Sequence, residues 1–450
     1  MKDYDVVVVG AGPIGSAAAF ALAKQGKRCL LLEAAPDAVR RYAGEWMHPT
    51  VVALMGGLGL QLPKAGQEND AGAGFIVHPE DGSAPIPLPY PDSQRGFCCS
   101  HYDLSVSLRE QAVALPNVEY IPFARAIDAQ RDGRVRFHVQ DSREDREVSA
   151  ELIIGAEGRS SVCRRALASD TNRDVVSYMA ALSLDGRVAL PTEGYGHIFM
   201  GGPGLVLAYR VSRDEVRLCL DVPEAESALR RDKELLYRAF EGALPASLRE
   251  PARAALSSDS TRWTATFFQP RTVRGEGRIA LVGDSVGLCH PLCSAGVAVG
   301  LLDVTLLAQA VEAGDLASYR ENGARETWVP ELMSTSVYQL LGRPDVGDAL
   351  RQTLYEAWRK DPSERDRTLN ILMGAERRPA QFVGSFARIG LGAVSRSLRP
   401  RRAGGASSRD GSVRQQVGSF ARWLRWPVAS VLPKWAVNRI RPASTIHAPF

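Results

Sequence analysis

The stretch YDVVVVGAGPIGSAAAFALAKQGKRCLLLEAA, residues 4–35, decides the fold. It opens with a run of four valines, which is typical of a buried parallel strand. A turn, Gly10-Ala11-Gly12-Pro13-Ile14-Gly15, leads into small residues that suit a helix, and a second apolar run ends in Glu33. Strand, glycine turn, helix and strand in this order predict a βαβ unit that binds a dinucleotide.

Each glycine of this turn has a separate expected task. Gly10 makes the tight turn, Gly12 lets the backbone approach a pyrophosphate, and Gly15 lets the helix pack closely on the strand. The positive end of the helix then faces the phosphates. Glu33 stands 18 residues after Gly15, where an acid takes the ribose hydroxyls of such a ligand.

Two later segments are predicted to belong to the same site. AELIIGAEGRSSVCRRAL, residues 150–167, has the pattern of a strand, a glycine turn and a basic helix start. GDSVGLCHPLCSAGVAVGLLDV, residues 283–304, follows a strand predicted over 278–282 and leads into a long apolar helix from Gly296. Asp284 at the end of that strand is placed to bond a ribityl hydroxyl, and the helix start can face a flavin ring with its positive end.

Together the three segments resemble the group A flavoprotein monooxygenases, which carry GxGxxG, a GADG-like motif and GD in this order. Glu157 stands here where the family usually has Asp. Within that group the chain most resembles the squalene epoxidases, through RYAGEWMHPTVVALMGGLGL (41–60), SLREQAVALPN (107–117) and the GD…HPL…G pattern (283–296). The resemblance covers most of residues 1 to 330.

The resemblance implies an α/β protein of the p-hydroxybenzoate hydroxylase type, with a Rossmann-like FAD-binding domain, an antiparallel-sheet substrate domain and a helical C-terminal region. The expected boundaries are 1–75, 100–175 and 271–330 for the discontinuous FAD-binding domain, 76–99 and 176–270 for the substrate-binding sheet, and 331–450 for the helical region with its basic, Trp-containing tail.

The same resemblance implies the contacts with FAD. The adenosine ribose is expected beside Glu33, the flavin side beside Trp46, and the ribityl or pyrophosphate region beside Asp284. A core position is the alternative for Trp46. The full expected set is Gly10, Gly12, Pro13, Ile14, Gly15, Glu33, Ala34, Arg41, Trp46, Asp284, Pro291, Gly296 and Val297. No side chain is assigned a catalytic role, because the flavin carries the chemistry, and no Cys/His cluster has metal-ligand spacing.

Three departures from the family pattern fall near the expected site. The family arginine that precedes the SLR helix and contacts FAD falls on Asp103, and what replaces it is left open. The family's active-site tyrosine falls near Phe75, which is expected to line the substrate site. HPLTGGG becomes HPLCSAG at residues 290–296, which suggests a reshaped pocket.

The resemblance implies a monooxygenase that uses NAD(P)H and O2 through a flavin C4a-hydroperoxide. It would epoxidise a C=C bond of, or hydroxylate, a lipophilic isoprenoid or a prenylated or aromatic natural product. NADH or NADPH would bind transiently, because no second nucleotide-binding unit follows. Two alternatives stay open: a flavin-dependent prenyl-chain reductase, and a lipid carrier that has lost its flavin. A halogenase is disfavoured, because the comparable place reads RWTATFFQPR rather than WxWxIP.

Charge is concentrated at the C-terminal end. From Gln381 onward the chain has twelve Lys or Arg and one acid, Asp410, although the net charge of the whole chain is only +4. Trp423, Trp426 and Trp435 lie in the same tail, and basic residues among tryptophans suit an anionic membrane surface. A solvated helical appendage is the alternative, and no nucleic-acid partner is expected.

Composition sets the expected compartment. No apolar run approaches the ~20 residues that span a bilayer. The seven cysteines are scattered without a disulfide or zinc pattern. A cytoplasmic protein, with peripheral membrane contact left open, is the expectation.

Overall fold

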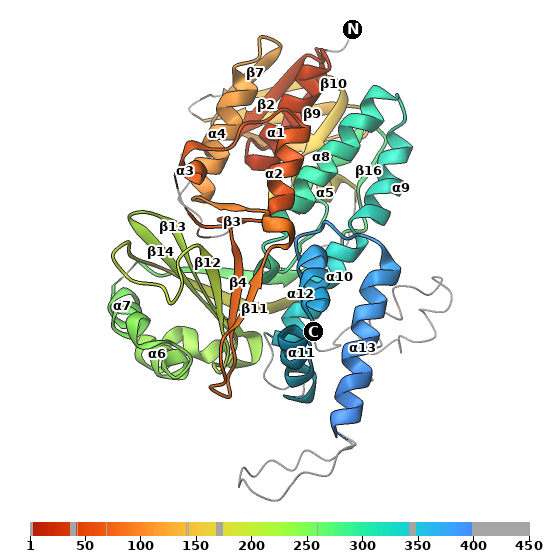
Figure 1. Ribbon diagram of the computed structural model, residues 1–450. Coiled ribbons are helices and arrows are strands. Elements are labelled where there is room, and N and C mark those ends of the chain that lie inside the picture. The colour runs from red at the N-terminus through yellow and green to blue at the C-terminus, as the bar shows by residue number, and fades with distance from the viewer. Residues whose placement is uncertain are drawn as a thin grey trace, which may run out of the picture.

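The computed structural model describes residues 3–36, 42, 44–68, 70–140, 142, 144–167, 174–258, 260–341 and 348–397. Two sheets dominate it, with a third layer of C-terminal helices (Figure 1). Arg41 and residues 398–450, which include the basic tail, lie outside the described residues.

A parallel sheet forms the N-terminal core, in the order β17-β10-β1-β2-β7. The valine run and the strand that ends in Glu33 form where the sequence predicts them. The strands are β1 (Tyr4–Val9), β2 (Cys29–Glu33), β7 (Val118–Pro122), β10 (Asp145–Gly155) and β17 (Ile279–Leu281), with β16 (Gly275–Glu276) antiparallel at the edge.

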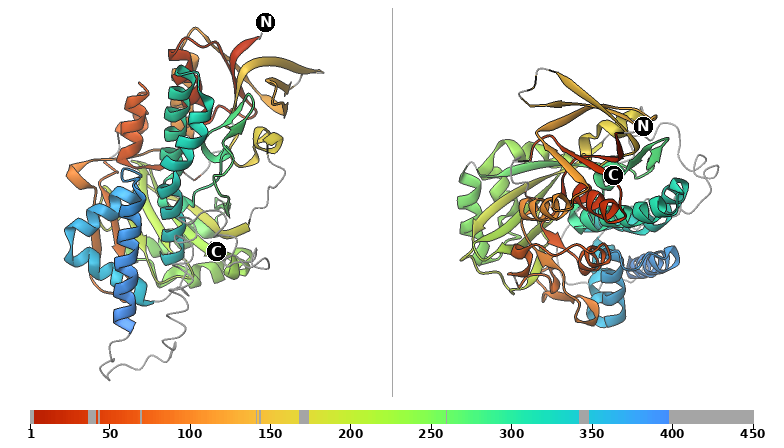
Figure 2. Two further views of the ribbon diagram at one scale, coloured as in Figure 1. Left: turned by 90° about the vertical axis from the view of Figure 1, so that its right-hand side faces the viewer. Right: turned by 90° about the horizontal axis from the view of Figure 1, so that it is seen from above.

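Both faces of this sheet are covered, which explains the continuous apolar runs of its strands. Val6 and Val8 pack toward the helices α1 (Pro13–Lys24), α4 (His101–Val113) and α8 (Gly296–Glu312). Val7 and Val9 pack toward the other face, which holds β8 (Ala124–Ala129), β9 (Arg134–Val139) and α5 (Val162–Leu167). Figure 2 shows this layering from two further sides.

The second sheet has seven strands, in the order β15-β11-β14-β13-β12-β4-β5. Only the β4–β12 pair is parallel. The strands are β4 (Gly74–His78), β5 (Ile86–Pro89), β11 (Asp174–Asp185), β12 (Tyr195–Phe199), β13 (Val206–Ser212), β14 (Glu215–Pro223) and β15 (Arg262–Phe268). The expected boundary after residue 75 falls inside β4, and the domain division as a whole stays a prediction.

The seven-stranded sheet has one core on each face. Even-numbered residues of β14, such as Leu218 and Leu220, pack under α6 (Lys233–Glu241) and α7 (Ala246–Ser257). Odd-numbered residues such as Cys219 point to the opposite face, where a second apolar cluster includes side chains of the C-terminal helices. We call this opposite face the inner face of the sheet.

The remaining elements connect the two sheets and cover the inner face. A short β3–β6 ribbon and two helices follow the first βαβ unit. The bounds are β3 (Trp46–Met47), α2 (Pro49–Gly57), α3 (Lys64–Gln67), β6 (Phe97–Cys98), α9 (Leu316–Glu326), α10 (Trp328–Leu341), α11 (Asp348–Lys360), α12 (Pro362–Leu372) and α13 (Pro379–Ser397). Among the described helices, none is long and apolar enough to cross a membrane.

The two glycine-rich segments meet through Ile14. A Cβ atom added at Gly300 would lie 2.6 Å from Ile14 Cδ1, and one added at Gly283 would lie 3.3 Å from Ile14 Cγ1. Gly283 also has a φ of +62°, which L side chains rarely adopt. The first turn of α1 therefore occupies the space that side chains at these two glycines would need.

This packing gives a stability prediction. We expect Gly300→Val to lower the free energy of unfolding by about 1–3 kcal/mol, because the new side chain overpacks against Ile14. Chemical denaturation of the purified protein measures the change. Ile14→Ala in the same chain should restore at least half of the loss.

Gly56→Val is the matched control. Gly56 is an exposed position of α2, and no described atom lies within 4 Å of a Cβ placed there. An equal loss of stability for Gly56→Val and Gly300→Val would contradict the packing argument.

Candidate functional site

The expected cofactor residues gather at the carboxyl edge of the parallel sheet. β1, β2, β10 and β17 are parallel neighbours, so the loops after Val9, Glu33, Gly155 and Leu281 leave from the same edge. Ligands of open α/β sheets bind at this edge. The fold thus brings together segments that are as much as 272 residues apart in the sequence, from Val9 to Leu281.

Within the first turn, two glycines are required by protein contacts and one is not. A Cβ at Gly10 would lie 2.7 Å from the carbonyl oxygen of Ala156, and one at Gly15 would lie 1.8 Å from the carbonyl oxygen of Gly10. No atom of the described chain lies within 4 Å of a Cβ placed on Gly12. The open space in front of Gly12 fits close approach of the backbone to a pyrophosphate.

Glu33 fixes the same turn from the end of β2. Its Oε2 accepts a hydrogen bond from the backbone N–H of Ala11 at 2.7 Å, and its Oε1 accepts one from Ala35 at 2.9 Å. Ala34 lies between these contacts and is half-buried. The acid therefore organises the loop in which a ribose is expected, and a contact of Glu33 or Ala34 with the ribose stays a prediction.

The GD segment follows β17 and faces α8. Asp284 is exposed, and a Cβ at Gly296 would lie 3.9 Å from Asp284 Oδ1, so the carboxylate lies near the first turn of that helix. Of the helices described, α1 and α8 both begin without a side-chain cap, and Pro13 and Gly296 are their first residues. Two helix N-termini that can attract negative charge are therefore available for a ligand.

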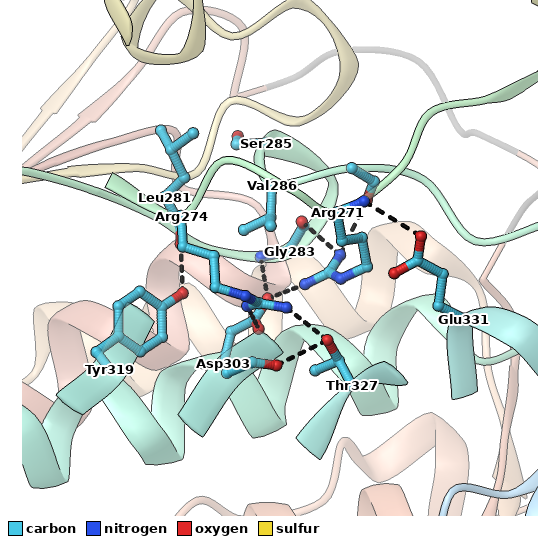
Figure 3. Close-up of polar contacts among 12 residues, drawn as sticks. Arg271, Arg274, Leu281, Gly283, Ser285, Val286, Asp303, Tyr319, Thr327 and Glu331 are labelled. Atoms are coloured by element: carbon cyan, nitrogen blue, oxygen red, sulfur yellow. Dashed lines mark hydrogen bonds and ion pairs between the residues drawn. The ribbon is translucent and has the colours of Figure 1, made fainter. Parts of the chain in front are cut away.

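Behind this turn lies a buried charge cluster that the sequence analysis did not identify (Figure 3). Asp303 of α8 forms ion pairs with Arg271 and with Arg274, the latter at 2.7 Å. Its Oδ2 also accepts the backbone N–H of Gly283 at 2.9 Å. Arg271 donates to the carbonyl oxygens of Gly283 and Gly287, each at 2.9 Å.

The cluster holds the GD turn by both ends. Burial lowers the pKa of Arg271, but Asp303, Cys289 and Glu331 together raise it by more, so the guanidinium stays charged. One sequence feature could have indicated this cluster: Asp303 is the only acid in the apolar run GVAVGLLDVTLL, residues 296–307. Its arginine partners could not be inferred from the sequence, because the fold alone brings them to the helix.

Three further expected residues lie at the start of α8 and beside it. Val297 is half-buried, and its Cγ2 would lie 3.7 Å from a Cβ on Gly44, whose φ is +64°. His101 is the first residue of α4, and its Nδ1 would lie 3.4 Å from the same Cβ. Pro291 is exposed in the loop that leads to α8. His101 is thus a side chain near the expected flavin end that the sequence analysis missed.

Trp46 lies between the cofactor edge and the inner face. It is 2% exposed, and its ring centroid lies 5.1 Å from that of Phe75 and 6.0 Å from that of Tyr209. Its indole N–H donates to the hydroxyl of Tyr90 at 3.0 Å. The core position considered as an alternative is what the described residues show, and a contact of Trp46 with the cofactor stays a prediction.

A second ion pair joins the loop before Trp46 to the sheet. Arg217 of β14 binds Glu45 with two hydrogen bonds, of 2.8 and 2.9 Å, and neither side chain is exposed to solvent. Tyr209 donates to Glu45 at 3.1 Å, and the Arg217 guanidinium lies 3.5 Å from the ring centroid of Tyr42. A bidentate pair of this kind fixes geometry as well as distance.

A neutral histidine ties the cofactor loop to the same region. Burial lowers the pKa of His48 to about 4. Its Nδ1 lies 2.6 Å from the Tyr90 hydroxyl and its Nε2 lies 2.8 Å from the carbonyl oxygen of Cys293. The carbonyl can only accept, so Nε2 carries the hydrogen, and Tyr90 then donates to Nδ1.

The two acidic departures from the family pattern have local roles. Asp103 lies in the first turn of α4, where its N–H donates to Ser100 Oγ at 3.0 Å and its carboxylate accepts from the same hydroxyl at 2.6 Å. Glu157 accepts from Ser161 Oγ at 2.7 Å and from the N–H of Cys163 at 3.1 Å, at the start of α5. Each acid stabilises a helix start.

Among the described residues, no group of three or more His, Cys, Asp or Glu side chains could hold a metal ion.

Comparison with known proteins gives two family matches. A family model described as squalene epoxidase matches residues 149–408, and a model described as FAD dependent oxidoreductase matches residues 5–171. The chain is 26% identical to squalene monooxygenase of Mus musculus over 376 residues, which is 78% of this chain and 64% of that protein. It is 27% identical to squalene monooxygenase of Eremothecium gossypii, over 71% of each chain.

Solved structures with a similar fold include two oxygenases. PqsL of Pseudomonas aeruginosa, described as a probable FAD-dependent monooxygenase, has a TM-score of 0.60 at 19% identity, over 82% of this chain and 99% of that chain. Tetrameric 2-methyl-3-hydroxypyridine-5-carboxylic acid oxygenase has a TM-score of 0.65 at 19% identity, over 83% and 97%. The expected α/β fold, the family resemblance and FAD as the cofactor are confirmed.

The cluster around Asp303 gives a prediction about cofactor affinity. We expect Asp303→Asn to weaken FAD binding about tenfold, or ~1.4 kcal/mol, because the GD turn loses its charged anchor while one hydrogen-bond acceptor remains. Titration of the apoprotein with FAD, followed by quenching of flavin fluorescence, measures this change.

Tyr319→Phe serves as the control, since the Tyr319 hydroxyl donates at 2.5 Å to the carbonyl oxygen of Leu281, which lies in β17 before the turn. This variant should lose about 1 kcal/mol of stability with FAD affinity unchanged. A folded Asp303→Asn protein that binds FAD as tightly as the wild type would refute the positioning role.

Proposed function

Because this chain belongs to the squalene epoxidase family, we propose that it is an FAD-dependent monooxygenase that uses NAD(P)H and O2 on a lipophilic substrate. Epoxidation of a C=C bond in an isoprenoid or prenylated molecule is the favoured reaction, and hydroxylation of an aromatic substrate is the second candidate. The matched region spans only 64% of the length of the mouse relative. The activity of that relative is therefore a proposal for this chain.

The observation that carries the proposal is the apolar inner face beside the cofactor edge. The cluster there draws side chains from the cofactor loops, from the sheet and from the C-terminal helices. Its members include Trp46, Phe75, Met179, Met200, Leu205, Leu207, Tyr209, Leu292, Leu340 and Leu354. These side chains are buried against one another, and a substrate bound among them would be surrounded by hydrocarbon rather than by water.

The roles proposed for the chain's own residues follow from this placement. Gly12, Pro13 and the N-terminus of α1 would bind the pyrophosphate, and Asp284 would bind the ribityl chain. Pro291, Gly296 and Val297 would border the flavin ring. Bound FAD would supply the activation of O2.

The inner face would orient the substrate and exclude water. The apolar side chains there leave few hydrogen-bonding groups that could stabilise water next to the ring. Phe75 on β4 would contact the substrate, because it lies 5.1 Å, centroid to centroid, from Trp46 at the edge of the same cluster. The hydrogen bond from His48 to Cys293 would hold the loop before α8 at a fixed distance from this surface.

The experiment that tests oxygenase activity uses labelled oxygen. We expect the FAD-loaded protein, supplied with NADPH or NADH under ¹⁸O2 and a polyprenyl substrate, to yield a product that carries one ¹⁸O atom. Mass spectrometry detects the label. The Asp284→Ala variant, which should bind FAD poorly, is the control for flavin dependence.

A product that gains two hydrogens and no oxygen would replace the monooxygenase proposal by the prenyl-chain reductase. A purified protein that binds no FAD at micromolar concentration would favour the lipid carrier.

Membrane contact through the C-terminal tail is a separate proposal that rests on sequence only. The chain from residue 398 onward lies outside the described residues, so the ten basic residues and three tryptophans in it carry the argument. We expect full-length protein to co-sediment with anionic liposomes, and a chain that ends at residue 395 to stay in solution. Equal sedimentation of the two chains would show that the tail is not the contact.

A further inference from the structure

A carboxyl group is buried on the inner face of the sheet without a partner. Asp221 of β14 has no exposed surface, and neither of its oxygens makes a hydrogen bond with the described chain. Burial raises its pKa to about 7, and the nearby Ser177 hydroxyl lowers it by a smaller amount. Within the described part of the chain Asp221 forms no ion pair, in contrast to Glu45 and Asp303.

The register of the sheet places two hydroxyls in line with this carboxyl. Asp221 lies opposite Met179 of β11, and Ser177 is the next residue of β11 on the same face. Ser177 in turn lies opposite Thr266 of β15. Thr266 is 4% exposed, and its hydroxyl also makes no hydrogen bond with the described chain. Three polar side chains therefore form a short band across three strands of an otherwise apolar face.

His290 joins this band to the cofactor loop. Its Nδ1 accepts the N–H of Leu292 at 3.3 Å, so its Nε2 carries the hydrogen and faces Ser177 Oγ at 3.4 Å. The ring stacks on Tyr338 of α10, with centroids 4.0 Å apart. The band thus adjoins the loop in which Pro291 is expected to border the flavin.

His290 and Cys219, which lie beside the band, are neutral at pH 7, and the charged Arg217 on the same face of β14 is paired with Glu45. Burial lowers the pKa of His290 to about 3 and raises that of Cys219, on the same face of β14, to about 12. The carboxyl is therefore costly to ionise, and its own hydrogen-bonding capacity is unused. A buried polar group that no protein contact satisfies calls for a partner from outside the chain, such as a water molecule or a polar group of a ligand.

We propose that Asp221, Ser177 and Thr266 form a hydrogen-bonding subsite that binds a hydroxyl group on the lipophilic substrate. The substrate class is then a hydroxyl-bearing isoprenoid or phenol and not an unfunctionalised hydrocarbon. This inference rests on the proposed function, which supplies the lipophilic substrate and the neighbouring flavin. The apolar neighbours Met179 and Leu205 would contact the hydrocarbon part of the same molecule.

The test compares two ligands that differ only in the hydroxyl: farnesol, and the hydrocarbon with the same skeleton. Binding to the FAD-loaded protein is followed by the change in flavin absorbance. We expect the wild type to bind farnesol at least tenfold more tightly than the hydrocarbon. Asp221→Leu should bring this ratio close to one by weakening farnesol alone, whereas Asp221→Asn should keep most of it.

Thermal unfolding gives an independent readout of the same variants. The pKa of Asp221 is raised in the folded state, so the folded protein holds a proton that the unfolded chain releases above pH ~4. The stability of the wild type relative to Asp221→Leu therefore falls as pH rises toward and through 7. We expect Asp221→Leu to have the higher Tm, by a margin that is larger at pH 8 than at pH 5.

The matched control is Asp214→Asn, an exposed position in the turn before the same strand. It should change neither the ligand ratio nor the pH dependence of Tm. An unchanged ratio in Asp221→Leu, or a lower Tm for that variant at pH 8, would overturn the subsite. If neither ligand bound the wild type, the lipophilic-substrate proposal would fail as well, which separates the two failures.

Discussion

Close packing of Ile14 against Gly283 and Gly300 is the constraint on which the rest of the structure depends. It brings the turn after β1 to the turn after β17 and the start of α8, although these segments are far apart in the chain. Side chains at either glycine would push the two turns apart. The absence of side chains at these two positions therefore allows the two turns to form one continuous cofactor edge.

Two buried ion clusters then fix the loops around this edge. Asp303 and its arginines hold the GD turn from behind, and Glu45 with Arg217 holds the loop before Trp46 against the sheet. Burying ion pairs is costly unless the geometry is good and the remaining hydrogen bonds are satisfied. The Glu45 pair meets this condition through Tyr209 and a backbone carbonyl. The Asp303 cluster meets it only in part, because Nε of Arg271 and Nε of Arg274 have no partner in the described chain. The two clusters therefore specify position more than they add stability.

The inner face of the seven-stranded sheet differs from these clusters, because it also holds a buried acid without an ion-pair partner among the described residues. Arg217 at one end of β14 is fully compensated, whereas Asp221, four residues along the same face, is not. The strand thus uses one polar position to fix a loop and leaves another unsatisfied. A face that combines apolar side chains with one unsatisfied polar band is suited to a molecule that is mostly hydrocarbon and carries one polar group.

The sequence alone determined the elements that depend on residues close together in the chain. The βαβ unit, the strand that ends in Glu33, the turn at Gly283-Asp284 and the long helix from Gly296 follow from glycine spacing and apolar runs, and all form as predicted. Only the tertiary structure decided which distant side chains meet. The partners of Asp303, the pairing of Glu45 with Arg217 and the band around Asp221 depend on strand order and register, which alternating apolar patterns do not encode. The same reason explains Trp46, whose local sequence allows either a cofactor contact or a core position, and whose neighbours Phe75 and Tyr209 come from other strands.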